Sequence, residues 1–492
     1  MIAALVAPIS VGSAHAAGDP GVTVWHRSSE MPPLQEVGSV FAENFGSEVT
    51  GNVGDVPTGP GVPEPDKEEL EGKGDLYPVD MGAETMEGEV GELPDLDGEE
   101  SETSVSIDEG AGEASPVEGE GPSPAPVGDG ILDWEACWKN RQGHRKQGVV
   151  LNHFSFCRWG WNTATKLDGQ GRVEGQVRFR ETELGSGSNT ARAGQINVKI
   201  TDVTWTPNGV FNRSSKMTVR LKAQGGPGAC TAAFDNGEDY TRPVGEWAGT
   251  YFAYDVKSPA ASGDQKRIDK RAYCRFTASW RVRGASADSS WSQGPENVMR
   301  MDSAAYLGQY GKQGAIFNQV TPYLVYDYKS KAIEGVAKHL FTAFDYPQLT
   351  FPKKSPVKTF PGDIEKRGWK PLHRNYPRFN AASAKVTRDN RSGKDKACAA
   401  WVAKVTPPAG WQCDEYPFAS TKEGAGLGDG NFSIRYVPRK ENASAGAELV
   451  KWYGRDRILD GDAYGIMLKN RPNLQSADLG SFPCVELGIC AP

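Results

Sequence analysis

The chain has 492 residues, of which 38% are hydrophobic, with 58 glycines and 33 prolines. Its length predicts two or three domains, and the low apolar share excludes a single globular unit with one continuous core. Residues 61–130 hold 22 acidic residues and two lysines, so the net charge of −8 conceals a remainder with 41 acidic and 53 basic residues. The protein is therefore a basic body joined to an acidic segment.

The N-terminus predicts export. Met1 to Ala17 is an apolar run that ends in Ala14-His15-Ala16, the small-x-small pattern of a signal-peptidase site. We expect residues 1–16 to be a signal peptide. No other run approaches the roughly 20 apolar residues of a transmembrane helix. The sequence thus favours a secreted, extracellular protein with no membrane span.

Residues 17–130 are predicted to be a disordered, acidic, Gly/Pro-rich linker. Between residues 61 and 130 the only aromatic residue is Tyr77. Such a segment cannot bury enough apolar surface to offset the conformational entropy of the chain. Its role stays open between a spacer, a pro-segment and an acidic decoy lying over a basic site.

Residues 131–360 predict an all-β, sandwich-like middle domain of unknown function. Alternating apolar residues, separated by Gly, Asn, Asp and Pro, predict several short antiparallel strands. The expected strands are 149–151, 173–179, 196–205, 217–221, 250–254, 275–282 and 319–328. We expect a cell-wall, glycan or protein ligand for this domain. His144 and His153 have no partner at metal-ligand spacing and are interpreted as scaffold residues.

Eight cysteines favour disulfide bonds, because their number is even and the chain is predicted to be exported. No two cysteines form a Cys-x-x-Cys motif, and no histidine stands at zinc-ligand spacing from them. Spacing alone does not prove which cysteines pair. Closeness along the chain favours Cys137–Cys157, Cys230–Cys274, Cys398–Cys413 and Cys484–Cys490.

Residues 361–492 predict a small α+β domain that carries the chemistry. A loop or strand with Asp414 and Glu415 precedes a strand-like run at 432–438 and a helix entered through Asn442. This order is the layout of a ββα-metal finger, in which a base on the first strand activates water and a divalent cation is held on the helix. The usual base is histidine. None follows His373, so a carboxylate is expected in its place.

Three spaced motifs carry a family resemblance. They are Cys413-Asp-Glu-Tyr-Pro-Phe-Ala419, then Glu423-Gly424, then Val437-Pro438-x-x-Glu441-Asn442-x-x-x-Gly446. Residues 370–468 resemble the NucA/NucB family of secreted deoxyribonucleases, and Arg457 to Tyr464 adds to the likeness. The resemblance implies a ββα-type fold, dependence on Mg²⁺ or Mn²⁺, and endonucleolytic cleavage of DNA and, in some members of the family, of RNA. Ala445 departs from the pattern, because a polar residue is expected there.

The same resemblance implies roles for individual residues. Asp414 and Glu415 are the expected catalytic residues, with Asp414 as the base, and Asn442, Glu441 and Glu423 are the expected metal site. Arg435, Arg439 and Lys440 flank the finger and are expected to hold phosphates.

Each assignment has a plain structural alternative. The Asp-Glu pair is also typical of a solvated turn, Asn442 of a helix cap and Glu441 of a residue that favours the helix dipole. Tyr416 and Phe418 are typical of core packing, with stacking on bases as the alternative.

The leading hypothesis is a secreted, metal-dependent endonuclease that cuts DNA with little sequence preference. One alternative is a wall- or glycan-binding protein with a degenerate nuclease tail. Another is a secreted antibacterial nuclease effector that is kept silent by its acidic segment or by an inhibitor protein.

Overall fold

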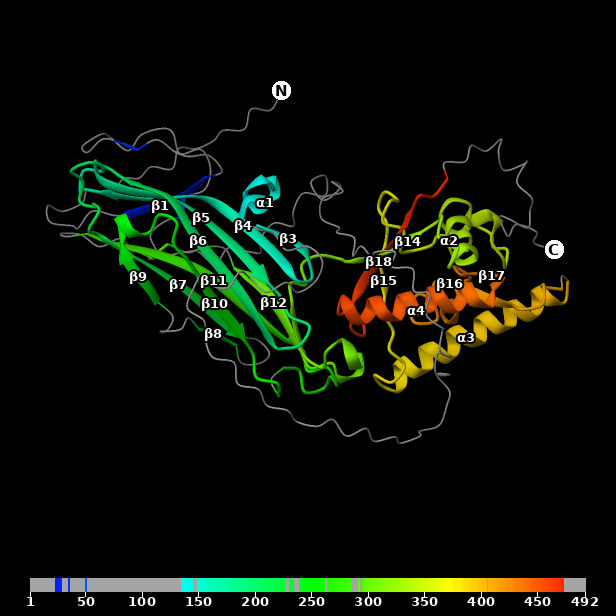
Figure 1. Cartoon of the computed structure of the whole chain (residues 1–492). Coiled ribbons are helices and arrows are strands. Elements are labelled where there is room, and N and C mark those ends of the chain that lie inside the picture. The colour runs from blue at the N-terminus through cyan, green and yellow to red at the C-terminus, as the bar shows by residue number, and fades with distance from the viewer. Residues whose placement is uncertain are drawn as a thin grey trace, which may run out of the picture.

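The computed structural model contains an all-β unit and a C-terminal α+β unit (Figure 1). The described residues are 23–28, 34–35, 49–50, 134–144, 148–225, 230–233, 239–261, 263–284, 291–292, 294, 296–404 and 406–472. The expected signal peptide, nearly all of the expected linker and the pair Cys484–Cys490 lie outside them. Within the described part, none of the helices has the length and apolar composition of a membrane span.

The all-β unit consists of two antiparallel sheets that face each other. The first sheet has the order β2-β1-β4-β5-β6-β10-β8, with β3 also paired to β4, and the second has the order β13-β12-β11-β7-β9. The strands of the first sheet are β1 (Thr23–Ser28), β2 (Val49–Thr50), β3 (Val149–Asn152), β4 (Ser155–Leu167), β5 (Val173–Ser186), β6 (Ala193–Trp205), β8 (Thr231–Ala233) and β10 (Tyr251–Lys257). Those of the second are β7 (Lys216–Gly225), β9 (Asp239–Pro243), β11 (Ala272–Arg283), β12 (Asn297–Asp302) and β13 (Gly314–Ile316). The expected sandwich is confirmed, and six of the seven expected strands lie in it.

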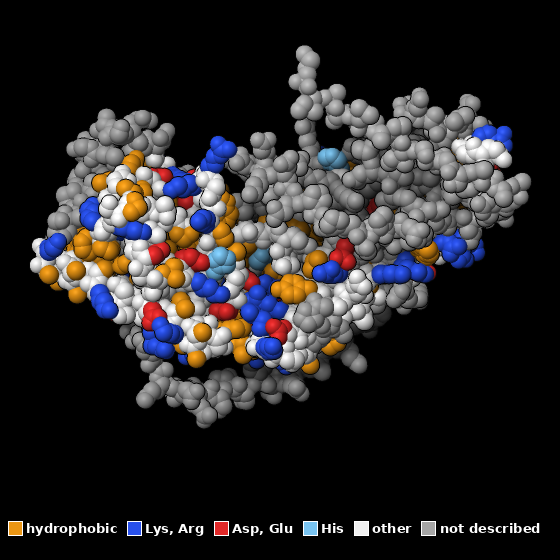
Figure 2. All heavy atoms as spheres, turned by 180° about the vertical axis from the view of Figure 1, so that it is seen from behind, with side chains coloured by type: hydrophobic (Ala, Val, Ile, Leu, Met, Phe, Trp, Pro, Cys, Tyr) orange, Lys and Arg blue, Asp and Glu red, His pale blue; other side chains and the backbone are white. Residues whose placement is uncertain are grey.

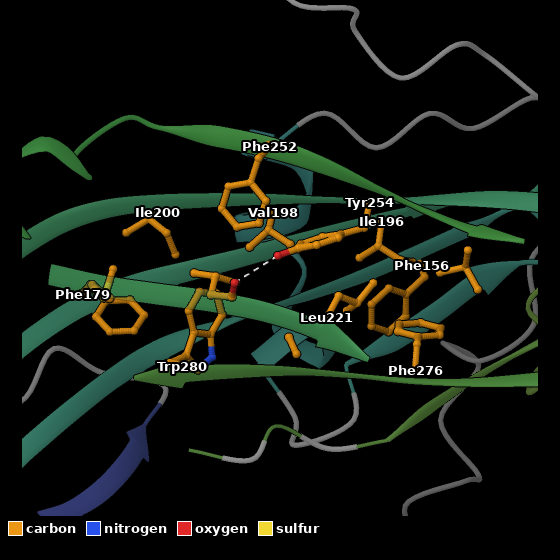
Figure 3. Close-up of a cluster of buried hydrophobic side chains, with 14 of the residues drawn as sticks. Phe156, Phe179, Ile196, Val198, Ile200, Leu221, Phe252, Tyr254, Phe276 and Trp280 are labelled. Atoms are coloured by element: carbon orange, nitrogen blue, oxygen red, sulfur yellow. Dashed lines mark hydrogen bonds between the residues drawn. The ribbon is translucent and has the colours of Figure 1, made fainter. Parts of the chain in front are cut away.

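One apolar core fills the space between these two sheets. Side chains of both sheets point into it, as Figure 3 shows, and Phe179 of β5 packs against Trp280 of β11 with ring centroids 5.4 Å apart. Tyr254 donates its hydroxyl hydrogen to the carbonyl oxygen of Val219 at 3.2 Å, so the one polar atom of that ring is paired. Fully burying a large apolar side chain is worth about 1.5–3 kcal/mol, which makes this core the main source of the unit's stability.

Three of the four expected disulfides are present. Cys137–Cys157 ties the helix α1 (Trp134–Lys139) to β4, Cys230–Cys274 joins the approach to β8 to β11, and Cys398–Cys413 lies in the C-terminal unit. Their Cα–Cα distances are 5.7, 5.6 and 6.2 Å. These disulfides are compatible with an extracellular location.

The C-terminal unit combines a three-stranded sheet, a β-hairpin and three helices. The sheet has the order β14-β18-β15, with β14 parallel and β15 antiparallel to β18. Its elements are β14 (Tyr323–Asp327), α2 (Glu334–Asp345), β15 (Leu372–His373), α3 (Ala381–Val402), β16 (Trp411–Tyr416), β17 (Ser433–Pro438), α4 (Arg439–Arg455) and β18 (Ala463–Lys469). Short 3-10 turns are η1 (Arg141–His144), η2 (Val244–Glu246), η3 (Ala305–Tyr310), η4 (Pro347–Leu349) and η5 (Ala425–Leu427).

The boundary expected between residues 360 and 361 requires correction. The seventh expected strand, 319–328, contains β14, which pairs with β18 and not with the sandwich. Helix α2 packs in the same core as α4, through Leu340 and Phe344 on one side and Trp452 on the other. The apolar pattern of residues 319–328 does not reveal which distant strand the segment pairs with. For this reason the pattern alone assigned the segment to the wrong unit.

Buried ion pairs hold the two units together. Asp462, just before β18, accepts hydrogen bonds from Arg271, just before β11, at 2.7 Å and from Arg300 of β12 at 2.6 Å. Burial by itself raises the pKa of a carboxyl, but Arg300 and Arg271 lower the pKa of Asp462 to about 2. Lys and Arg side chains, with Asp and Glu beside them, gather near the middle of the face seen from behind (Figure 2). His153 adds a contact of 2.6 Å between its Nδ1 and the carbonyl oxygen of Asp456.

Arg457 is the centre of this junction. Its Nε and Nη2 donate to the two carboxylate oxygens of Asp302 at 3.0 and 2.6 Å, and both side chains are fully buried. The backbone of Arg457 has a φ of 57°, in the left-handed region that non-glycine residues rarely adopt. A Cβ added at Gly314 would lie 1.9 Å from its Nε, so glycine is needed there.

We predict that Arg457→Ala lowers the free energy of unfolding by about 3–5 kcal/mol, because it removes the bidentate partner of a buried carboxylate. Thermal and denaturant unfolding of the full chain would measure this loss. The control is Arg455→Ala, at an exposed position two residues away. Equal midpoints for the two variants would show that the junction carries no such energy.

Candidate active site

The candidate site lies where β16, β17 and α4 follow one another along the chain. Side chains alternate across β16, and the disulfide from Cys413 to Cys398 shows that one face meets α3. Asp414 therefore points to the other face, toward α2 and α4, together with Gln412. The strand–strand–helix order expected from the sequence is present, and the expected apolar face of α4, with Leu449, is buried.

A histidine from α2 holds the carboxylate of Asp414. The Nδ1 atom of His339 lies 2.7 Å from Oδ2 of Asp414, and its Nε2 is hydrogen-bonded to the hydroxyl of Ser433. An ionised carboxylate only accepts hydrogen bonds, so Nδ1 carries the proton and donates it. In the neutral ring Nε2 then accepts, and Ser433 donates.

The two side chains differ in their access to water. The side chain of His339 is 2% exposed, whereas that of Asp414 is 11% exposed. Oδ1 of Asp414 has no hydrogen-bond partner among the described residues. Water can therefore reach the carboxylate while the imidazole stays enclosed. This arrangement suits a base with one oxygen held by a buried side chain and the other open to water.

His339 is the residue of the candidate site that was not singled out from the sequence. The absence of histidine after His373 led us to expect a carboxylate as the base, and in the fold His339, which precedes His373 in the sequence, lies beside that carboxylate. The signal was present: His339 stands among Val336, Leu340 and Phe344 on an apolar helix. A histidine buried in such surroundings needs hydrogen-bond partners, and so points to a polar site nearby.

Arg435 lies directly across the hairpin from Asp414 and is buried, with 7% of its surface exposed. Burial lowers the pKa of its guanidinium to about 10. Asp414 and Glu441 act in the opposite direction, which places both carboxylates near it. The expected phosphate-binding surface is thus divided: Arg435 is inside the site, whereas Arg439 and Lys440 are exposed in the first turn of α4.

The first turn of α4 offers oxygen ligands. The amide nitrogen of Asn442 donates to Oε1 of Gln412 at 3.4 Å, and Oε2 of Glu441 accepts from the backbone N–H of Gly335. The amide oxygen of Asn442 and Oε1 of Glu441 have no hydrogen-bond partner among the described residues. No group of three or more His, Cys, Asp or Glu side chains stands at metal-binding distance in the described part of the chain. One carboxylate and one amide oxygen fit Mg²⁺ or Mn²⁺, since such ions are often held by few protein ligands and several waters.

Glu423 is placed apart from this cluster. Its two oxygens accept from the backbone N–H and from Nδ1 of His373, at 2.9 and 2.7 Å. This pair fixes the loop after β16 onto β15. The contacts of Glu423 are thus with a histidine of the sheet rather than with Asn442 or Glu441, the other two residues of the expected metal site.

Glu415 and Ala445 both have buried surroundings. Glu415 points to the α3 side, away from Asp414, and its Oε2 has no hydrogen-bond partner among the described residues. Ala445, where a polar residue was expected, is 4% exposed, and its carbonyl oxygen accepts from the hydroxyl of Tyr326. The position therefore packs in the core. Tyr416 is likewise buried, and Phe418 packs against the same core. Core packing, rather than stacking on bases, was the expected role of both rings.

The strand, loop and helix that build this site coincide with a known sequence family. Residues 367–467 match the model of the deoxyribonuclease NucA/NucB family. The resemblance read from the motifs is confirmed, and it supports a deoxyribonuclease. No curated protein and no solved structure matches the chain. The NucA/NucB region contains Asp414 and Asn442, but α2 lies before it, so His339 reaches the site from outside the matched residues.

Glu415 predicts a pH dependence of stability. Burial raises its pKa to about 8, with Asp414 adding to the effect and Lys394 opposing it. The unfolded value is about 4.3, so between these values the folded protein holds a proton that the unfolded chain has lost. The stability that the protonated Glu415 contributes is complete below about pH 4 and is lost as the pH rises to 8. Over that range the free energy of unfolding falls by up to about 1.4 kcal/mol per pH unit.

We predict that Glu415→Gln flattens this slope, because an amide does not titrate. Denaturant unfolding of the full chain from acidic to mildly alkaline pH would measure it. Glu135→Gln is the control, since that side chain is 70% exposed. A slope that persists in Glu415→Gln would contradict the assignment.

Proposed function

We propose that the protein is a secreted, metal-dependent endonuclease that hydrolyses DNA phosphodiester bonds with little sequence preference. The proposal rests on the carboxylate of Asp414 in β16, which His339 of α2 holds in place near the start of α4. Asp414 lies within the NucA/NucB region. Export is supported by the signal-peptide pattern at residues 1–16 and by the three disulfides.

Asp414 is the general base in this proposal. Its Oδ1 takes a proton from a water molecule as the water oxygen attacks phosphorus. The bond from phosphorus to the 3′-oxygen breaks, and the leaving oxygen takes a proton from solvent. His339 positions the base: with Oδ2 held by the imidazole N–H, the carboxylate presents Oδ1 to the water. Ser433 in turn fixes the ring of His339.

A divalent cation, when bound, supplies positive charge where the phosphate and the leaving oxygen become more negative. Asn442 and Glu441 are the residues that would hold it. Arg439 and Lys440 are exposed in the first turn of α4, and in this proposal they contact the DNA backbone. Contacts of that kind give affinity without reading the base sequence. Arg435, beside the base, adds a fixed positive charge inside the site.

We predict that Asp414→Asn lowers the rate of plasmid cleavage at least about 100-fold, because asparagine cannot accept the proton of water. Plasmid conversion with Mg²⁺, with Mn²⁺ and with EDTA would measure it. Asp395→Asn, an exposed substitution of the same type on α3, should cleave as the parent does. Full activity in Asp414→Asn would contradict the mechanism, and no cleavage by the parent under any of these conditions would contradict the proposed function.

We predict that His339→Ala lowers kcat by a factor on the order of 100 while KM changes little, because His339 orients the base and does not touch DNA. His339→Gln, which can still donate an N–H to Asp414, should recover part of kcat. Steady-state kinetics on a fluorescent duplex would separate the two constants, with circular dichroism to verify folding. A rise in KM at constant kcat would assign His339 to DNA binding instead.

A further inference from the structure

A band of basic side chains covers the outer face of the second sheet of the sandwich. Residues of β7 and β11 alternate, with the apolar set pointing into the core and the basic set pointing outward. We call this surface the basic face. It consists of Lys216, Arg220 and Lys222 of β7 with Arg275, Arg281 and Arg283 of β11.

Two carboxylates lie beside the basic face: Asp239 pairs with Arg220, and Glu296 pairs with Arg275 at 3.2 Å. Asp239 is the one acidic residue in β7, β9 and β11. The hydrogen bond from Arg220 lowers the pKa of Asp239, and Lys222 and Arg283 lower it further. The six cations still outnumber these two carboxylates, and the exposed residues Lys216 and Lys222 thus stand in a field that favours anions.

An aromatic ring lies among these cations. The guanidinium carbon of Arg220 is 4.3 Å and that of Arg281 is 5.9 Å from the ring centroid of Trp291. The indole holds both guanidinium groups in place beside the exposed lysines, and Nε and Nη2 of Arg220 donate to Asp239.

The same sheet face carries the junction to the nuclease unit. Arg300 and Asp302 of β12, the strand beside β11, make the buried contacts to Asp462 and Arg457. The junction follows the C-terminal end of α4, and the candidate site lies at its start. A helix of 17 residues is about 25 Å long. The candidate site therefore lies about 25 Å from the junction, and the basic face begins on β11, the strand next to the junction.

We propose that the basic face is a second DNA-binding surface, which holds the backbone of the same DNA molecule that is cut at Asp414. The inference rests on the proposed function. The surface carries lysine and arginine ends, which bind phosphates without reading sequence. The basic face can contact only DNA that extends from the site beyond the junction, about 25 Å away. At 3.4 Å per base pair, such DNA has more than about eight base pairs. The acidic residues 61–130 are the competing occupant, and the binding test distinguishes them.

The first test measures binding in the full chain made inactive by Asp414→Asn. The test variant adds Lys216→Gln, Lys222→Gln and Arg275→Gln. The control adds Lys139→Gln, Arg172→Gln and Lys257→Gln instead, which remove the same charge from exposed positions on the all-β unit. Fluorescence anisotropy with a labelled duplex of about 40 base pairs would give Kd over a range of NaCl concentrations.

We expect the test variant to bind at least about tenfold more weakly at low salt, with the slope of log Kd against log salt reduced by about two to three, since each lost phosphate contact removes about 0.9. The control should bind as the parent does. An unchanged Kd, or an equal loss in the control, overturns the proposal. Tighter DNA binding by the test variant also overturns it, because it identifies the acidic segment as the occupant.

The second test measures cleavage in chains that keep Asp414. With the three substitutions, kcat/KM for the duplex of about 40 base pairs should fall about tenfold, while that for a hairpin of about eight base pairs stays the same. Equal losses on both substrates overturn the proposal. A parent chain that cuts neither substrate contradicts the proposed function, while the binding test on the inactive chain still decides whether the basic face holds DNA.

Discussion

The structure depends on two buried carboxylates, Asp302 and Asp462, that are paired with arginines across the junction of the units. A charge removed from water is costly unless its partner is held in good geometry, so these pairs fix both surfaces together. The contacts begin directly after α4, the helix that bears Asn442. The sandwich is therefore more than an appended module, because contacts at both ends of α4 determine the position of that helix.

The site itself is assembled from three separate stretches of sequence. Asp414 and Ser433 come from the hairpin, Asn442 from the helix after it, and His339 from α2, which lies outside the NucA/NucB match. Packing of α2 against α4 brings the histidine to the carboxylate. A shift of either helix would change the geometry around Asp414, so the stability of the core and the orientation of the base are linked.

Local patterns predicted much of this arrangement. Alternation identified the strands of the sandwich, nearness along the chain identified three disulfides, and the motif around Asp414 identified the hairpin and the family. Long-range pairing was not predictable. Nothing local in residues 323–345 shows that β14 pairs with β18, and for this reason the domain boundary and His339 were missed. Burial was equally hidden: Glu415 and Arg435 are charged in sequence, yet both lie inside the fold.

The disulfide between Cys398 and Cys413 has a consequence for the compartment in which the strand that bears Asp414 becomes anchored. Cys413 is the residue before Asp414, so the bond anchors the catalytic strand to α3 next to the base. In a reducing cytosol that anchor is open. Under the proposed export, oxidation completes the anchor only after the chain has left the compartment that holds the producer's own chromosome. On the proposed function, β16 is therefore anchored beside Asp414 only where the chain is separated from the producer's own DNA.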